Sequence, residues 1–314
     1  MEGSAGEPAD PAFLDDVLNG LAASPKVLSS RWLYDERGSQ LFEDITQLPE
    51  YYPTRTETAI FKAHAAEMAA AAGARAVLVE YGAGAAVKTR ILLDALEQPC
   101  AYAPLDISED FLTGVAEGLQ ADYPDLDIRP VAADFMTPTD LSGLPDCGGR
   151  RVGFFPGSTI GNLTNPQIVT FLREARRALG PDSRFLLGAD LRKSPDILIP
   201  AYDDAQGVTA AFNLNLLHRI NRELDGNFDV SGFAHEARWN AAESRIEMHL
   251  VSARAQLVRI AGREFAFAAG ESVRTEISRK FALPDLDALI SQGGWNLQQT
   301  WQDEAGYFCV ALLS

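Results

Sequence analysis

The segment Val77-Leu-Val-Glu-Tyr-Gly-Ala-Gly84 decides the fold of this chain. It has the pattern of a buried apolar strand that runs directly into a glycine turn, and a helix-like pattern follows from Val87 to Leu96. Glycines let the backbone approach a ligand closely, and the free N–H groups at the start of a helix can bind it. The segment therefore predicts a nucleotide-sized binding site at the end of a strand.

Two acidic residues make this predicted site more specific. Asp106 ends a second apolar run, at about the distance where a ribose-binding acid is expected, and Asp134, followed by Phe135, ends a third run. A ligand with two ribose hydroxyls, a base that needs an edge contact and a ring that needs stacking would use all three strand ends. This arrangement favours S-adenosylmethionine. The alternatives are a dinucleotide, whose third glycine would fall at Val87, and a tight turn that binds no ligand.

Composition limits the kinds of partner. The chain has 314 residues, 46% of them hydrophobic, so we expect one large domain or two interleaved domains. The net charge of −17 opposes binding to nucleic acid and to anionic membrane surfaces, which are polyanions themselves. No apolar run reaches membrane-spanning length, and we expect no membrane association.

Cysteine and histidine usage indicates neither disulfides nor a metal site. Cys100, Cys147 and Cys309 are odd in number and well separated, so we expect no disulfide framework and no CxxC metal site. The four histidines show no ligand spacing. The acidic N-terminus lacks the features of a secretory signal. A reduced, cytoplasmic protein is the expectation.

Strand and helix patterns alternate through the middle of the chain, which predicts a parallel sheet covered on both faces. Thr54-x-x-Glu57 predicts a capping box that opens a helix, and Asn165-Pro166 marks the start of another. After Asp190 a helix over about 203–224 precedes alternating runs typical of an antiparallel sheet, and a final hairpin returns to the main sheet. The expected strands of the main sheet are 77–81, 101–105, 127–132, 151–155 and 184–189, and the expected helices between them are 87–97, 108–120 and 166–179.

The predicted fold class is therefore α/β, a doubly wound sheet with a second, smaller α+β domain. We expect residues 60–194 and 283–314 to form the sheet domain. Residues 1–59 and 195–282 are expected to form the second domain, packed over the strand ends where ligands bind in such sheets.

Four further segments carry more polar or aromatic side chains than a core needs. Each also has a simpler explanation: a surface turn, an Asx turn, a helix start, or a strand face turned to water. On the last of them, alternation places Glu276 and Ser278 on the same face of a strand. The segments are Leu48-Pro-Glu-Tyr-Tyr-Pro-Thr-Arg-Thr-Glu57, Gly157-Ser-Thr-Ile-Gly-Asn-Leu163, Ala201-Tyr-Asp-Asp204 and Thr275-Glu-Ile-Ser278.

Together with the first glycine turn and Lys88-Thr-Arg90, these segments resemble the histidine-specific Nα-methyltransferases of ergothioneine biosynthesis. The resemblance extends from Trp32 to the C-terminal strands. Members of this family often have Leu-Gly-Ser-Gly at the first turn, where this chain has Tyr81-Gly-Ala-Gly84. The resemblance implies a Rossmann-like class I methyltransferase sheet and three successive methylations of L-histidine, which yield Nα,Nα,Nα-trimethylhistidine (hercynine).

The resemblance also implies roles for individual residues. The implied cofactor contacts include an acid on the ribose hydroxyls and an acid–aromatic pair around the adenine, with Tyr34 near the methionine end. Tyr51, Asn162 and Tyr202 would hold the amino-acid end of the substrate and act at the reacting amine. Glu276 and Ser278 would bind the imidazole, with Met248 lining that pocket. The implied S-adenosylmethionine contacts are Tyr34, Gly82, Lys88, Asp106, Asp134 and Phe135.

A carboxylate and a hydroxyl that face two ring nitrogens satisfy an imidazole at both ends. Phenylalanine or leucine would leave these groups buried and unpaired, at about 1–3 kcal/mol per group. Tryptophan is a closer competitor, so methylation of another aromatic amino acid is one alternative, and a non-catalytic S-adenosylmethionine-binding protein is another. We expect a monomer that acts on free histidine and has no metal.

Overall fold

The computed structural model describes residues 10–84, 86–107 and 109–314. The chain forms two compact units. Unit 1 contains the described residues up to Tyr52 together with Lys193–Ser278, and unit 2 contains Pro53–Arg192 and Arg279–Ser314. The chain therefore passes between the units near residues 53, 193 and 279, where the sequence suggested boundaries near 60, 195 and 283.

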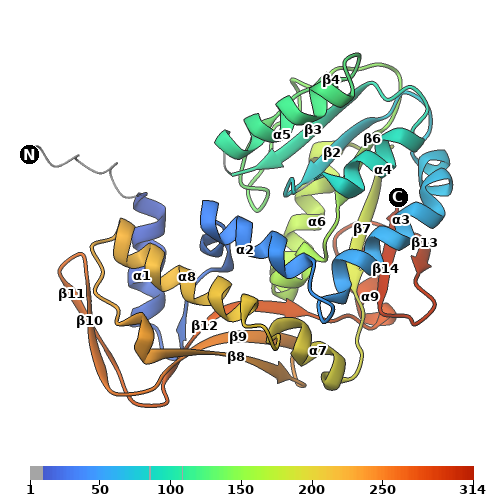
Figure 1. The fold of residues 1–314 in the computed structure, drawn as a ribbon. Helices are drawn as coiled ribbons and strands as arrows, with labels where there is room; N and C mark the ends of the chain where they lie inside the picture. The colour runs from blue at the N-terminus through green and yellow to red at the C-terminus, as the bar shows by residue number, and fades with distance from the viewer. Residues whose placement is uncertain (1–9, 85, 108) are drawn as a thin grey trace, which may run out of the picture. The chain divides into compact units, whose positions relative to one another are not determined.

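Unit 2 is built on an eight-stranded sheet of order β13-β14-β7-β6-β2-β3-β4, with β5 beside β3 (Figure 1). The pairs β3-β2, β2-β6, β6-β7, β3-β4 and β3-β5 are parallel, whereas β14 runs antiparallel to both β7 and β13. The strands are β2 (Val77–Tyr81), β3 (Ala101–Asp106), β4 (Asp127–Ile128), β5 (Val131–Ala132), β6 (Arg151–Phe155), β7 (Arg184–Asp190), β13 (Leu297–Gln302) and β14 (Phe308–Leu313).

Helices cover both faces of this sheet. One face packs against α6 and α9, and the other packs against α3, α4 and α5. Because the central strands are buried on both sides, they are almost continuously apolar. The predicted doubly wound α/β sheet, closed by an antiparallel hairpin, is confirmed. The helices are α3 (Tyr52–Ala72), α4 (Val87–Ala95), α5 (Glu109–Asp122), α6 (Asn165–Leu179) and α9 (Leu283–Gln292).

Two local predictions in unit 2 are wrong. The strand expected over 127–132 is split into β4 and β5, because Pro130 between them has no N–H to donate to a ladder. The capping box at Thr54 does not form, because α3 already begins at Tyr52 and Thr54 lies inside its first turn. The Glu57 carboxylate binds other partners, described below. The predicted start of α6 is confirmed: Thr164 caps it, with Gln167 completing a capping box.

Unit 1 contains a four-stranded sheet of order β1-β12-β9-β8 and a separate hairpin, β10-β11. Helix α8 packs along β8 and β9, and α2 packs on α8. The elements are α1 (Pro11–Ala22), β1 (Lys26–Val27), η1 (Ser30–Leu33), α2 (Glu36–Thr46), α7 (Pro195–Tyr202), α8 (Val208–Glu223), η3 (Val230–Gly232), β8 (Phe233–Asn240), β9 (Arg245–Ser252), β10 (Gln256–Ile260), β11 (Arg263–Phe267) and β12 (Ser272–Arg279).

The helix expected over 203–224 is α8, which begins later than expected. Tyr202 ends α7, and α8 begins only at Val208. Between them, the carboxylate of Asp204 accepts hydrogen bonds from the backbone N–H groups of Val208 and Thr209, at 3.1 and 2.7 Å. Asp204 therefore satisfies N–H groups that the first turn of α8 leaves without a helical partner. Strand β8 was not predicted, because its burial does not alternate regularly.

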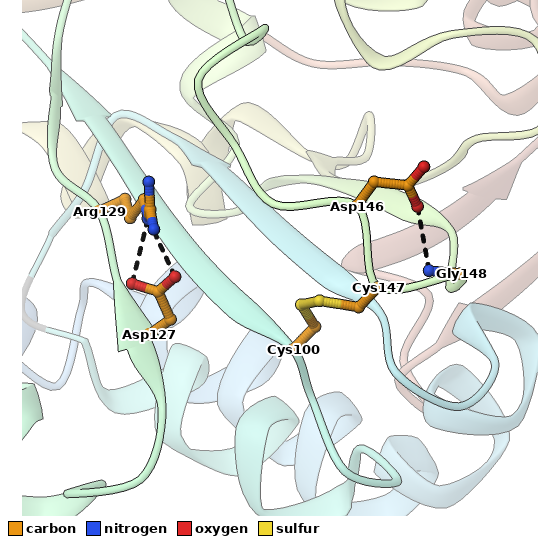
Figure 2. The surroundings of a disulfide bond; sticks show 6 residues. All are labelled: Cys100, Asp127, Arg129, Asp146, Cys147 and Gly148. Carbon is orange, nitrogen blue, oxygen red and sulfur yellow. Dashed lines mark hydrogen bonds and ion pairs between the residues drawn. A yellow bond between two sulfur atoms is a disulfide. The ribbon is translucent and has the colours of Figure 1, made fainter.

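A disulfide joins Cys100, just before β3, to Cys147, in the loop before β6 (Figure 2). The two Cα atoms are 6.3 Å apart. The expectation that the chain has no disulfide is therefore wrong. Because β3 and β6 both run parallel to β2, on its two sides, the residues that precede them meet at one edge of the sheet, although 47 positions separate them. Cys309 is a free, buried thiol in β14.

Among the described residues, no helix is long and apolar enough to cross a membrane. In the same part of the chain, no group of three or more histidine, cysteine, aspartate and glutamate side chains could hold a metal ion.

Candidate functional site

The glycine turn after β2 is held against the end of β3. Gly82 has a φ of 71°, in the left-handed region that favours glycine. The backbone N–H groups of Gly82 and Ala83 both donate to the carbonyl of Leu105, at 2.9 and 3.2 Å. Because Tyr81 pairs with Leu105 in the sheet, Gly82 lies at the level of Asp106. The first predicted acid and the glycine turn therefore lie next to each other.

The second predicted acid reaches the same edge through β5, which pairs with β3 so that Asp106 faces Ala132. Asp134 follows two residues later, and one of its carboxylate oxygens accepts a hydrogen bond from the backbone N–H of Met136 at 2.8 Å. The Phe135 ring lies next to the turn. A Cβ added to Gly82 would be 3.8 Å from this ring. The structure thus brings four of the predicted cofactor residues together at the carboxyl ends of the strands.

Lys88 lies in the first turn of α4, and its ammonium group forms an ion pair with Glu57 of α3. The distance from Lys88 Nζ to Glu57 Oε2 is 2.5 Å. Glu57 is completely buried. The sequence pattern made Glu57 the partner of a helix cap at Thr54. Its contact with Lys88 had no sequence signal, because 31 positions separate the two residues.

Asn162 ends a short 3-10 helix, η2 (Thr159–Asn162), that follows β6. The turn before η2 is anchored at Ser158, whose hydroxyl accepts a hydrogen bond from the backbone N–H of Asp190 at 2.9 Å. The Asp190 side chain in turn pairs with Lys280 at 2.7 Å, and both side chains are fully buried. Since β6 runs parallel to β2, Asn162 lies beyond the same end of the sheet as Gly82.

The chemistry of this edge fits S-adenosylmethionine. Asp106 supplies a carboxylate at a strand end, where ribose hydroxyls are bound in such sheets. Asp134 and Phe135 supply a polar group and an aromatic ring side by side, which suits the adenine edge and face. A Cβ at Gly82 would reduce the space next to the Phe135 ring.

The residues predicted to bind the substrate lie mostly in unit 1. The rings of Tyr51 and Tyr202 make an edge contact, with centroids 6.1 Å apart. The hydroxyl of Tyr202 lies 2.8 Å from the hydroxyl of Ser278 on β12, and both residues are buried. Ser278 therefore faces protein rather than water, which excludes for this residue the simpler explanation of a solvent-facing strand.

Tyr34 lies among these residues. Desolvation by the surrounding protein raises the pKa of Tyr34 well above its usual value, and the nearby Glu276, Tyr51 and Tyr202 raise it further. The Tyr34 hydroxyl consequently stays protonated and can donate a hydrogen bond at neutral pH. The structure groups Tyr34 with the predicted substrate residues of unit 1, and its place near the methionine end of the cofactor stays a prediction.

Glu276 is half-buried on β12, and Met248 on β9 is 1% exposed. The carbonyl of Met248 accepts a hydrogen bond from the hydroxyl of Thr275 at 3.2 Å, which places Met248 next to the strand that carries Glu276. The structure thus collects all the substrate residues predicted within unit 1 around α7, β9 and β12.

Sequence reasoning missed three side chains around this group. The rings of Phe42 and Phe212 each make an edge contact with Tyr34, with centroids 5.4 Å away. His235 donates from Nε2 to the carbonyl of Tyr202 at 2.8 Å, while its Nδ1 lies 2.9 Å from the amide of Asn213. The sequence pattern of Phe212 is that of an ordinary core residue of an amphipathic helix, and no motif marks His235 or Phe42.

A doubly wound sheet whose strand ends carry a glycine turn, an acid and an acid–aromatic pair is typical of nucleotide-cofactor enzymes of the methyltransferase type. Residues 13–314 match the family described as histidine-specific methyltransferase, SAM-dependent. The chain belongs to this family, and the predicted family, enzyme class and cofactor are confirmed.

Relatives agree with this assignment. The histidine N-alpha-methyltransferase of Mycolicibacterium smegmatis is 45% identical over 98% of this chain and 96% of its own length. The enzyme of the same name from Mycobacterium tuberculosis is 44% identical over 96% and 94%. Ergothioneine biosynthesis protein 1 of Neurospora crassa is 33% identical over 66% of this chain and 24% of its own length. The chain is a histidine-specific methyltransferase that depends on S-adenosylmethionine.

Proposed function

We propose that the chain transfers three methyl groups in succession to the α-amine of free L-histidine and releases Nα,Nα,Nα-trimethylhistidine. The observation that supports this proposal is a group of polar side chains in unit 1. The group contains the carboxylate of Glu276, the hydroxyl of Ser278 and the phenols of Tyr34, Tyr51 and Tyr202. Such a set suits a small zwitterion with a polar ring. The family supports histidine as the substrate, and the names of the mycobacterial relatives support the α-nitrogen.

In this proposal, the edge of the sheet in unit 2 holds S-adenosylmethionine. Asp106 binds the ribose hydroxyls, Asp134 and Phe135 bind the adenine, and Gly82 and Lys88 complete the site. When bound, the cofactor supplies an electrophilic methyl group on a sulfonium. The protein's main task is then to hold and orient the amine, because an in-line displacement depends on the alignment of the reacting atoms.

The side chains of unit 1 hold the histidine. Glu276 and Ser278 bind the two imidazole nitrogens, and Met248 lines the ring. Tyr51 and Tyr202 hold the amino and carboxylate groups. Asn162 is a further proposed contact of the substrate. The raised pKa of Tyr34 keeps its hydroxyl neutral, so Tyr34 acts as a hydrogen-bond donor at neutral pH and not as a base.

The amine must lose a proton before each transfer, because an ammonium group has no lone pair. A nearby sulfonium and partial desolvation both disfavour a second positive charge, so they lower the pKa of the substrate ammonium. Repeated transfer also requires that the amine rotates in a site tolerant of methyl groups. Aromatic rings offer such a surface, and those of Tyr51 and Phe42 pack edge to face with their centroids 6.1 Å apart.

Mass spectrometry of the product from free histidine and S-adenosylmethionine tests this function. Products heavier by one, two and finally three methyl groups support it. The same assay with tryptophan, phenylalanine and tyrosine, each alone, tests the alternative substrates. A higher kcat/KM for any of these amino acids than for histidine contradicts the substrate assignment, and tight cofactor binding without any turnover would support a non-catalytic role.

We also propose that the chain acts as a cytoplasmic monomer that binds no nucleic acid. Its net charge of −17 opposes a polyanionic partner at long range. Light scattering coupled to size-exclusion chromatography gives the mass in solution, and a mass of twice 34.1 kDa contradicts the monomer.

A further inference from the structure

Glu57 is a fully buried carboxylate in unit 2 that the proposed mechanism does not use. It projects from α3, and no part of it is exposed. Its Oε2 atom lies 2.5 Å from the ammonium of Lys88. Both of its carboxylate oxygens also lie 2.9 Å from the backbone N–H of Gly157, which donates to them. One carboxylate therefore joins α3, the start of α4 and the loop that follows β6.

Two glycines make room for this arrangement. A Cβ added to Gly188 on β7 would come within 2.1 Å of Glu57 Oε1, far inside contact distance. Gly157 has a φ of +78°, which residues with a side chain rarely adopt. In this conformation, the N–H of Gly157 points at the Glu57 carboxylate. The sequence thus provides a space fitted to a buried carboxylate.

A structural role alone explains this carboxylate poorly. Removing a charged group from water is expensive, and a buried ion pair is often no more stabilising than a well-packed apolar pair of the same size. Glu57 does not cap its own helix either, because it lies in the interior of α3 and its carboxylate binds Lys88 and Gly157.

One partner of Glu57 is a proposed cofactor contact, and the other lies next to a proposed substrate contact. Lys88 is a proposed contact of the cofactor. Gly157 begins the turn that leads into η2 and to Asn162, a proposed contact of the substrate. We propose that Glu57 is a positioning residue that orients Lys88 and fixes the loop 157–162, so that one carboxylate sets a cofactor contact and a substrate contact together. This inference rests on the roles proposed above for Lys88 and Asn162.

The substitution Glu57→Gln separates this role from simple space-filling. The amide has nearly the same shape, but it has no charge for Lys88, and its NH2 group must face a second donor, either the ammonium of Lys88 or the N–H of Gly157. We expect Lys88 to lose its orientation and the loop to loosen. Glu57→Asp keeps the charge but retracts it by one methylene, so it cannot hold both partners, and we expect an intermediate effect.

Calorimetry with S-adenosylhomocysteine measures the cofactor part without turnover. Because a charge-assisted hydrogen bond is worth more than a neutral one, we expect Glu57→Gln to weaken binding by about tenfold or more. Lys88→Met should weaken it similarly, and the double variant should bind no worse than Lys88→Met alone, because Glu57 acts through Lys88. Multiplicative losses in the double variant, or a Glu57→Gln affinity within about twofold of the unsubstituted protein, would overturn the inference.

Hydrogen exchange measures the effect on the loop. In Glu57→Gln, peptides that span residues 156–163 should exchange faster, while peptides from β2 should keep their protection. Faster exchange throughout unit 2 would instead mean that Glu57 serves only stability, and the inference would fail. If Glu57→Gln does not fold, Glu57→Asp is measured in its place with the same criteria, and unchanged binding and exchange in that variant count against the inference.

Glu67→Gln is the matched control. Glu67 lies on the same helix, but its carboxylate accepts a hydrogen bond from the indole of Trp301, at 2.9 Å, rather than from Lys88 or Gly157. Binding and loop exchange should be unchanged in this variant. The substrate assignment is tested separately: if the unsubstituted protein methylates no histidine, the proposed function fails, whereas full activity of the unsubstituted protein with unaltered Glu57 variants overturns only this inference.

Discussion

The hydroxyl of Tyr202, at the end of α7, lies 2.8 Å from the hydroxyl of Ser278 on β12, and both side chains are buried. The two groups proposed to bind opposite ends of histidine are therefore directly coupled. Tyr202→Phe and Ser278→Ala should each lower kcat/KM for histidine. Because either change breaks the same hydrogen bond, the double variant should lose less than the product of the single losses, with a coupling of about 1 kcal/mol. Additive losses in this cycle contradict the coupling.

Glu276 is expected to determine the preference for histidine. Glu276→Gln replaces a charged acceptor for the imidazole N–H with a weaker, neutral one, and we expect kcat/KM for histidine to fall by about tenfold to one hundredfold. The affinity for S-adenosylhomocysteine should not change. Glu264→Gln is the control, since Glu264 pairs with Arg259 on the surface hairpin of unit 1. An unaltered preference for histidine over tryptophan in Glu276→Gln contradicts the proposed imidazole site.

Asp106 ends β3 at the level of Gly82, where the ribose is proposed to bind. Asp106→Ala removes an acceptor for two hydroxyls, and we expect the affinity for S-adenosylhomocysteine to fall by about tenfold or more, since each lost charge-assisted bond is worth about 1.5–3 kcal/mol. Calorimetry measures the change. Asp127→Ala, on the neighbouring short strand β4 and exposed at its pair with Arg129, is the control and should bind normally. Unaltered affinity in Asp106→Ala contradicts the ribose assignment.

Glu80 makes the stability of unit 2 depend on pH. Burial raises the pKa of Glu80 to about 7, against the opposing effect of hydrogen bonds from Tyr102 and Thr89. In the unfolded chain, Glu80 loses its proton near pH 4.5, so the folded state holds a proton that the unfolded state has released. The stability linked to Glu80 is therefore fully present below pH 4.5 and is lost as the pH rises to about 7.

Glu80→Gln removes this dependence. The shift corresponds to about 3 kcal/mol, so the free energy of unfolding of the variant, relative to the unsubstituted protein, should rise by about this amount between pH 4.5 and pH 8. Urea denaturation at several pH values measures the difference, and the contributions of all other groups cancel in it. A difference that is independent of pH means that Glu80 is ionised in the folded protein well below pH 7.

The disulfide between Cys100 and Cys147 should stabilise the sheet by constraining the unfolded chain. For a loop of 47 residues, the chain-entropy relation gives about 4 kcal/mol as an upper estimate. A reducing agent, or Cys147→Ser, should lower the free energy of unfolding by up to this amount, and Cys309→Ser should leave the effect of the reductant unchanged. Mass spectrometry under non-reducing conditions detects the Cys100–Cys147 peptide pair, and its absence from the purified protein contradicts the bond.

The sequence was most informative where an acid follows an apolar strand. In a parallel sheet the carboxyl ends of neighbouring strands share one edge, so Gly82, Asp106 and Asp134 had to lie near one another once their strands were recognised. Pro130 and Tyr52 show the limit of such local reasoning. A single missing N–H split one predicted strand. A helix that began already at Tyr52 turned Glu57, the predicted partner of a cap at Thr54, into a buried carboxylate with distant partners.

The substrate residues of unit 1 could be named from a family resemblance, whereas local patterns did not identify them. Tyr34, Tyr51, Tyr202 and Glu276 come from separate segments, and alternation alone left Glu276 and Ser278 facing either water or protein. Burial of Ser278 against Tyr202 and the effect of Glu276 on Tyr34 depend on how α7, α8 and β12 pack. The roles of these residues toward histidine stay predictions.

The sequence by itself determined the doubly wound sheet, its glycine turn and the acids at its edge, because strand and helix periods and turn residues are local properties of the chain. Only the tertiary structure decided that Cys100 meets Cys147, that Glu57 holds Lys88 and Gly157, and that Tyr34 lies with Glu276. These contacts join residues far apart in the chain. They form where packed elements leave space for particular side chains, as Gly188 does for Glu57, and no periodic pattern records such a space.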